Sequence, residues 1–248
     1  MNLLSALPAD IALIAAVFLL AGMVKGVVGL GLPAIAIGLL ALVMPPAAAA
    51  SLVLLPALLT NIAQASGPAL LPLLRRLWPM LAAIVPGAMA GSAVIAADGA
   101  ALPVLGLALL AYAAWGLAAP PFRLSPRIER ISAVPIGLMG GALTGATGIF
   151  VIPVVPWLGA LGLARDALVQ ALGLGFLAGT TALALALAWQ GEVTTSLATG
   201  SALAVAPALA GQWLGGRLRG LLPAPVFRRV FFVALLALGA QLAWRGIS

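Results

Sequence analysis

The stretch Gly22-Met23-Val24-Lys25-Gly26-Val27-Val28-Gly29-Leu30-Gly31-Leu32-Pro33 places the only lysine of the chain between glycines, inside a long apolar run. A charge within such a run and a break in its helix both cost free energy, unless a function uses them. Glycine also lets the backbone come close to a ligand. We therefore interpret this stretch as one half of an anion site inside a membrane.

The composition identifies the bilayer as the solvent of this chain. Of 248 residues, 64% are hydrophobic and 7% are charged, and apolar runs long enough to cross a bilayer recur almost from end to end. A soluble domain carries about a quarter charged residues, and a transmembrane β-barrel needs alternating polarity, which this sequence lacks. The sequence predicts an all-α integral membrane protein with a single transmembrane domain over residues 1–248.

The absence of two residue types excludes several kinds of chemistry. The chain contains no cysteine and no histidine, which removes disulfides, thiol chemistry and the usual zinc and copper ligands. We therefore expect no metal and no cofactor. The net charge of +7 comes from arginines in short loops, where they act as topology signals, so we expect no nucleic-acid partner.

Glycine, proline and charged loops divide the chain into ten apolar segments. A polar stretch at 120–130 joins segment five to segment six, and we expect it to be a cytoplasmic linker between repeat one (1–119) and repeat two (131–248). The predicted segments are 10–28, 32–44, 47–66, 78–97, 100–119, 131–147, 149–160, 167–189, 195–215 and 227–244.

The two halves match each other at a spacing of 119 residues. At this spacing Gly22, Gly26 and Gly29 fall on Gly141, Gly145 and Gly148, while Lys25 falls on Thr144. The order of short and long segments repeats as well. These matches predict a structural repeat of about five helical segments.

The arginines predict that the two repeats have opposite orientation. If each short segment turns back in the membrane, ten of the eleven arginines lie on one side, and Arg245 lies on the other with Asp10, Asp98 and Glu192. The positive-inside rule prefers this arrangement to eight spans, which would divide the arginines six to five. Both termini would then face outside.

The short segments 32–44 and 149–160 should hold the binding site. A segment of 13 residues spans roughly 20 Å, too little to cross a core of about 30 Å. Short interrupted segments in matching places of two repeats point to a binding site near the midplane, and the start of a half-helix suits an anion. The predicted substrate-binding residues are Lys25, Gly26, Gly29, Gly31, Asn61, Gln64, Thr144, Gly145, Thr147, Gly148 and Thr180.

Each of these residues also has a structural interpretation. Glycines at this spacing are common where membrane helices pack closely, which is the favoured interpretation of Gly22 and Gly141. Lys25 could snorkel to the interface. Asn61, Gln64 and Thr180 could form hydrogen bonds between helices instead of lining a site.

The stretch 22–64, with its Lys-Gly-x-x-Gly-x-Gly-x-Pro motif followed by Thr60-Asn61-x-x-Gln64, resembles the TauE/SafE family of membrane proteins. The element 141–148 and the loop 222–229 are similar to that family too. The resemblance implies a secondary transporter of the bacterial inner membrane that exports small anions such as sulfite, sulfoacetate or related organosulfonates. Its partners would be the anion and the lipid bilayer, with a homodimer left open.

Two alternatives from other classes remain at this point. An intramembrane enzyme is disfavoured, because the chain lacks cysteine, histidine and a deep pair of carboxylates. A non-transporting membrane subunit could bind a partner through its basic loops. Anion-dependent stabilisation would distinguish a transporter from such a subunit.

Overall fold

A computed structural model describes residues 8–96, 101–118, 122–150, 152–218 and 224–246. All regular elements in these ranges are α-helices, as predicted. They are α1 (Pro8–Val28), α2 (Leu32–Leu40), α3 (Pro46–Ala65), α4 (Leu70–Ala96), α5 (Ala101–Ala118), α6 (Pro126–Thr147), α7 (Val154–Gly159), α8 (Arg165–Trp189), α9 (Thr195–Leu218) and α10 (Ala224–Arg245).

Two helices begin earlier than the apolar pattern predicts. Helix α4 begins at Leu70, so Arg75 and Arg76 lie in its first turns and not in a loop. Helix α6 begins at Pro126 within the predicted linker, because Ser125 caps it by accepting a hydrogen bond from the Ile128 N–H at 3.4 Å. A helix can thus begin before its apolar run, because capping residues and not hydropathy set where it starts.

Several helices have the length and hydropathy of membrane spans. Four described helical ranges are long and apolar enough to cross a bilayer, and three shorter ones are also apolar. The four are Pro46–Ala65, Leu70–Val94, Asp166–Trp189 and Thr195–Leu218, and the shorter ones are Ile11–Val27, Leu102–Ala118 and Phe232–Arg245. With nine and six residues, α2 and α7 are too short to cross alone.

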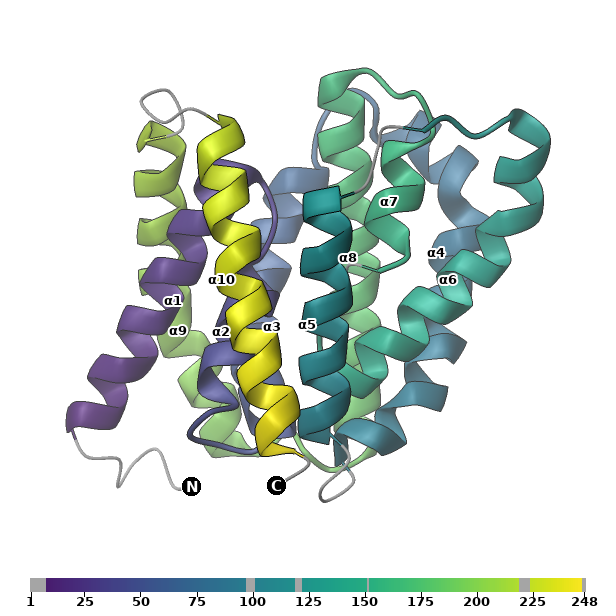
Figure 1. The fold of residues 1–248 in the computed structure, drawn as a ribbon. Helices are drawn as coiled ribbons and strands as arrows, with labels where there is room; N and C mark the ends of the chain where they lie inside the picture. The colour runs from purple at the N-terminus through teal and green to yellow at the C-terminus, as the bar shows by residue number, and fades with distance from the viewer. Residues whose placement is uncertain (1–7, 97–100, 119–121, 151, 219–223, 247–248) are drawn as a thin grey trace.

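Exchanging the two halves of the chain would leave the set of closely packed helix pairs unchanged. Helix α1 packs on α9 and α4 packs on α6, and each of these pairs becomes the other when the halves are exchanged. The pairs α3–α8 and α5–α10 each map onto themselves. In Figure 1 the members of both self-matching pairs run in opposite directions. This arrangement is compatible with inverted repeats, whose boundaries stay predictions.

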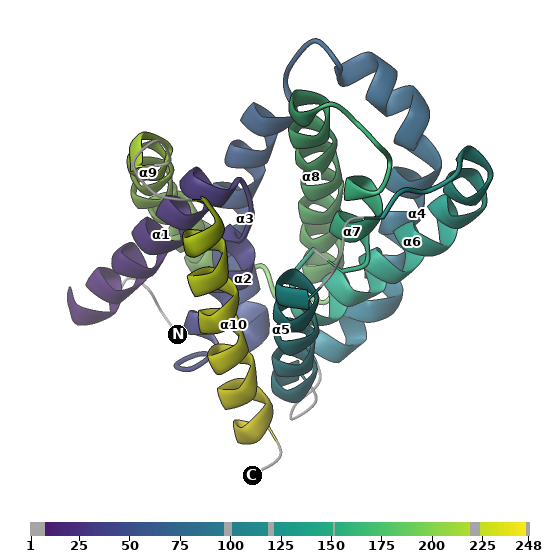
Figure 2. The ribbon, with the colours of Figure 1, turned by 45° about the horizontal axis from the view of Figure 1, so that its top comes forward.

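Figure 2 shows how these pairs are grouped. Helices α1, α9 and α10 lie on one side of the molecule, and α4 and α6 lie on the other, with α3 and α8 between them. Helix α1 begins and α10 ends at the same end of the bundle (Figure 1). The ends of α4, α6 and α8 that carry arginine lie at the opposite end. Which end faces the cytoplasm stays a prediction.

Glycines allow the close approach of α1 to α9 and of α4 to α6. A Cβ atom at Gly22 would lie 2.1 Å from the Ala208 carbonyl oxygen, and one at Gly141 would lie 2.2 Å from that of Ile84. No larger side chain fits such contacts without moving a helix. Helix packing therefore explains both of these glycines.

Candidate functional site

The first helix break lies between α1 and α2. The Gly29 N–H donates to the Lys25 carbonyl at 2.7 Å, and the chain then turns at Gly31, whose φ of 102° is in the left-handed region that favours glycine. Helix α2 begins at Leu32 with Pro33 in its first turn. The break therefore places the start of a nine-residue helix next to Lys25, inside the bundle.

The second break has a different form. Gly148 ends α6 with a φ of 73°, and its N–H donates to the Thr144 carbonyl at 2.7 Å. Helix α7 begins only at Val154, so the chain between the two helices is longer than the predicted break. The predicted start of this segment at residue 149 is wrong, because glycine at the end of α6 stops the helix before proline allows the next to start.

Lys25 is buried, and neutral side chains surround its ammonium group. The residue is 4% exposed, and its Nζ donates to Thr60 Oγ1 at 2.8 Å and to Asn61 Oδ1 at 2.5 Å. The Thr60 hydroxyl lies 2.8 Å from the carbonyl oxygen of Pro56, which is inside α3. Because that carbonyl takes the Thr60 proton, a Thr60 lone pair is free to accept from Lys25. The Lys25 side chain therefore stays inside the bundle and does not snorkel to the interface.

Asn61 and Thr180 connect the two halves at the centre of the site. The Asn61 Nδ2 donates to Thr180 Oγ1 at 3.1 Å, and these residues are 119 positions apart. That separation equals the predicted repeat spacing, so the two residues are counterparts in the predicted repeat. Counterparts of a two-fold arrangement meet only near its axis. Lys25 and Thr144 line the same cavity as Asn61 and Thr180, so all four residues lie where the two halves of the chain meet.

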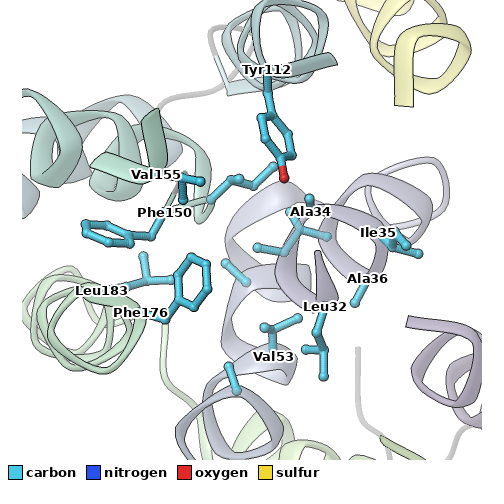
Figure 3. Close-up of a cluster of buried hydrophobic side chains, with 14 of the residues drawn as sticks. Leu32, Ala34, Ile35, Ala36, Val53, Tyr112, Phe150, Val155, Phe176 and Leu183 are labelled. Carbon is cyan, nitrogen blue, oxygen red and sulfur yellow. The ribbon is translucent and has the colours of Figure 1, made fainter. Parts of the chain in front are cut away.

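A small cavity lies beside Lys25, with a volume of about 20 Å³. This volume holds about one water molecule. Both halves line the cavity, and six of the predicted residues do so: Lys25, Gly31, Asn61, Thr144, Gly148 and Thr180. Phe150 and Phe176 close one wall, with ring centroids 6.2 Å apart at 84° (Figure 3).

The other predicted residues lie around this cavity and not in its lining. A Cβ atom at Gly26 would lie 2.3 Å from the Gln212 carbonyl oxygen on α9, and one at Gly145 would lie 2.1 Å from that of Ala88 on α4. Both glycines therefore serve helix packing. The Gln64 Nε2 donates to the Gly29 carbonyl at 3.3 Å, and Thr147 Oγ1 accepts from the Ile149 N–H at 3.2 Å. Gly29, Gln64 and Thr147 thus stabilise the two breaks.

Three groups of residues at the site were not among the predicted binding residues. The aromatic wall of Phe150 and Phe176 carries no sequence signal beyond the position of Phe150 directly after the second break. Pro33 and Ala34 line the cavity because the first turn of α2 faces it, which the short segment could have indicated. Thr60 contacts Lys25 directly, and its place next to Asn61 made it detectable.

The site has one cationic side chain and no anionic one among its described lining residues. The ion pair among the described residues joins Arg76 to Glu129 at one end of the bundle, with 2.7 Å between Nε and Oε1. The first-turn N–H groups of α2 add a partial positive charge beside Lys25. The site can therefore accept a small anion, because no negatively charged side chain among its described lining residues neutralises Lys25.

Comparison with known families identifies the chain. The model of the sulfite exporter TauE/SafE family matches residues 14–242. The chain belongs to the TauE/SafE family. Membership in the TauE/SafE family confirms the resemblance seen in the sequence, and it makes this protein a multi-pass membrane transporter of the sulfite-exporter type. No curated protein and no solved structure matches the chain.

Proposed function

We propose that this protein is a secondary transporter that exports small anions, such as sulfite, sulfoacetate or related organosulfonates, by alternating access. The observation that carries the proposal is Lys25, a buried cation with neutral partners between two helix breaks. A buried charge without a counter-ion is costly, and a bound anion would compensate it. The family membership supports transport of this class of substrate.

The site offers several donors to such an anion. Lys25 has three N–H donors, of which two have protein acceptors, so one is left for a ligand. Thr180 accepts from Asn61, which leaves the Thr180 hydroxyl proton for another acceptor. The start of α2 contributes backbone N–H groups and the positive end of its dipole.

The small size of the cavity supports a site that opens and closes. About 20 Å³ cannot hold an organosulfonate, so the walls must separate for the substrate to bind. Residues of both halves form these walls, and relative motion of the halves would open the site. Such motion about a midplane site is the mechanism of many transporters built from inverted repeats.

The membrane potential favours export of an anion. An inside-negative potential drives a single negative charge outward by about 2.3 kcal/mol per 100 mV. Export could therefore proceed without a coupling ion. We propose this direction with the termini outside, in a bacterial inner membrane.

Transport by proteoliposomes tests this proposal. Vesicles containing the protein should release sulfite or sulfoacetate faster than empty vesicles. The Lys25→Met variant should lose this activity, because it removes the charge. Methionine has a similar length, so the packing around it should be kept. Wild-type protein should also show a higher melting temperature with the transported anion than with chloride.

A matched control is Arg75→Met, which removes one positive charge from an exposed position at the end of the bundle. This variant should transport at the wild-type rate. Unchanged transport by Lys25→Met would refute the role of Lys25. No transport and no anion-dependent stabilisation of the wild type would favour the non-transporting subunit.

A further inference from the structure

A second cavity lies between α5 and the second helix break, separate from the lining of the Lys25 site. Its volume is about 270 Å³, and its lining side chains are aliphatic apart from Tyr112. It is open to the surroundings, since Leu107 on its wall is 60% exposed. The volume is sufficient for a hydrocarbon group, because an engineered cavity of about 150 Å³ in another protein binds benzene.

This open cavity, called the groove below, exists because little of the protein packs on one face of α5. Val104, Leu107, Ala108 and Ala111 line the groove, and their spacing is that of a helix face that packs on a neighbour. The main neighbour of α5 is instead α10, on another face. Among the described residues α6 reaches the groove through Leu143. Ala108 and Ala111 leave space for the groove because their side chains are small.

The surroundings of the groove decide what can occupy it. Leu102–Ala118 is an apolar helix, so we expect the groove to face the hydrocarbon part of the bilayer. Its aliphatic side chains cannot satisfy a polar ligand. A flexible hydrocarbon chain fits an apolar groove of this size, and bilayer phospholipids supply such chains at the highest local concentration.

We propose that the groove between α5 and the second break binds one acyl chain of a membrane phospholipid. This inference does not depend on the identity of the transported anion. The bound chain would pack on Ile149 and Ile152 of the second break. Their neighbours Gly148 and Phe150 line the Lys25 cavity, so this lipid would support a wall of the anion site from behind.

Figure 3 shows a second link between the groove and the site. Tyr112, which lines the groove, extends from α5 toward Ala34 on α2, and Ala34 lines the Lys25 cavity. Tyr112 is 1% exposed and packs edge-on against Phe232 of α10 at 5.2 Å. An acyl chain in the groove would therefore contact the second break directly. It would also contact Tyr112, which extends toward the helix that follows the first break.

Native mass spectrometry of protein purified in a mild detergent tests the proposal. The wild type should retain one phospholipid per chain. The Ala108→Trp variant should lose it, because the indole would fill the groove. Added phospholipid should raise the melting temperature of the wild type and leave that of Ala108→Trp unchanged.

Two further variants keep the test decisive. Val233→Trp places the same side chain at an exposed position of α10 outside the groove, and it should retain the lipid. Leu107→Asn makes the groove polar at an exposed residue, so it should fold and lose the lipid even if Ala108→Trp does not fold. A wild type without bound phospholipid, or equal retention by all variants, would overturn the proposal, as would loss from Val233→Trp.

Discussion

The two helix breaks occupy matching places in the two halves, yet they differ in charge and in the element that faces the site. The first break contributes Lys25 and the first turn of α2 to the cavity. The second contributes Thr144, Gly148 and Phe150, which belong to the end of α6 and the chain after it. The two halves thus differ in chemistry at matching breaks, because one supplies the charge and the other supplies hydroxyl and aromatic groups.

The breaks also differ in how they are held. In the second half, Trp157 of α7 donates to Ser132 Oγ at 2.8 Å, and Arg76 donates to the Leu161 carbonyl at 3.3 Å as well as to Glu129. In the first half, Arg245 donates to the Leu42 carbonyl in the turn after α2 at 3.1 Å. Gln64 also donates to the Gly29 carbonyl of the first break at 3.3 Å, so side-chain hydrogen bonds hold both breaks through different partners.

The largest expected effect comes from making the first break resemble the second. Lys25→Thr should weaken anion binding by about tenfold to a hundredfold, because hydrogen bonds to charged groups contribute roughly 1.5–3 kcal/mol. Adding Thr144→Lys should restore part of the affinity, because Thr144 lines the same cavity from the other half. Isothermal titration with the transported anion measures both changes. A double variant as weak as Lys25→Thr would show that the halves are not interchangeable at this position.

The next prediction tests whether the uncompensated charge of Lys25 at the first break binds the anion. Asn61→Asp would place a carboxylate in contact with Lys25, where an amide oxygen now lies at 2.5 Å. This internal counter-ion should compete with the substrate and weaken binding by about tenfold or more. Asn61→Thr, which introduces the residue of the second half, is the matched control and should have a smaller effect. Equal binding by Asn61→Asp would contradict the charge argument.

A third prediction concerns the shape of the second break. Gly148→Ala should lower the free energy of unfolding by about 2–3 kcal/mol, through its left-handed backbone and the contact of a new Cβ with the end of Ile37. Gly162→Ala separates the two causes, because its φ of 66° is similar and nothing lies within 4 Å of its added Cβ. It should cost about 1 kcal/mol. Thermal unfolding in detergent measures both, and equal losses would remove the packing contribution.

The smallest effect concerns the ion pair that holds the second half. Hydrogen bonds from Arg76 hold the pKa of the Glu129 carboxyl below its ordinary value of 4.5. The pair therefore adds its full stability above pH 4.5, and the contribution is lost as the pH falls below this value and Glu129 takes up a proton. Glu129→Gln should destabilise the protein by no more than about 1 kcal/mol at pH 7, because the pair is partly exposed. The difference between the variant and the wild type should shrink in acid, and a difference that grows there would be inconsistent with this assignment.

The sequence by itself determined the solvent, the helices and the residues to consider as a candidate site. Helix formation in a bilayer follows from local composition, since every backbone group must be satisfied within its own segment. Lys25 and the glycine spacing were detectable for the same reason, because a charge and a helix break inside an apolar run are each costly. The repeat spacing of 119 even indicated that Asn61 and Thr180 correspond.

Only the tertiary structure decided which of these residues face the cavity. Gly26 lies next to Lys25 in the chain, yet it packs against α9, because consecutive residues of a helix point about 100° apart and the neighbour's position decides their roles. Asn61 and Thr180 bond each other because α3 and α8 cross where the halves meet. The groove beside α5 is likewise a property of packing, since α5 is apolar all round and its sequence does not indicate which face remains uncovered.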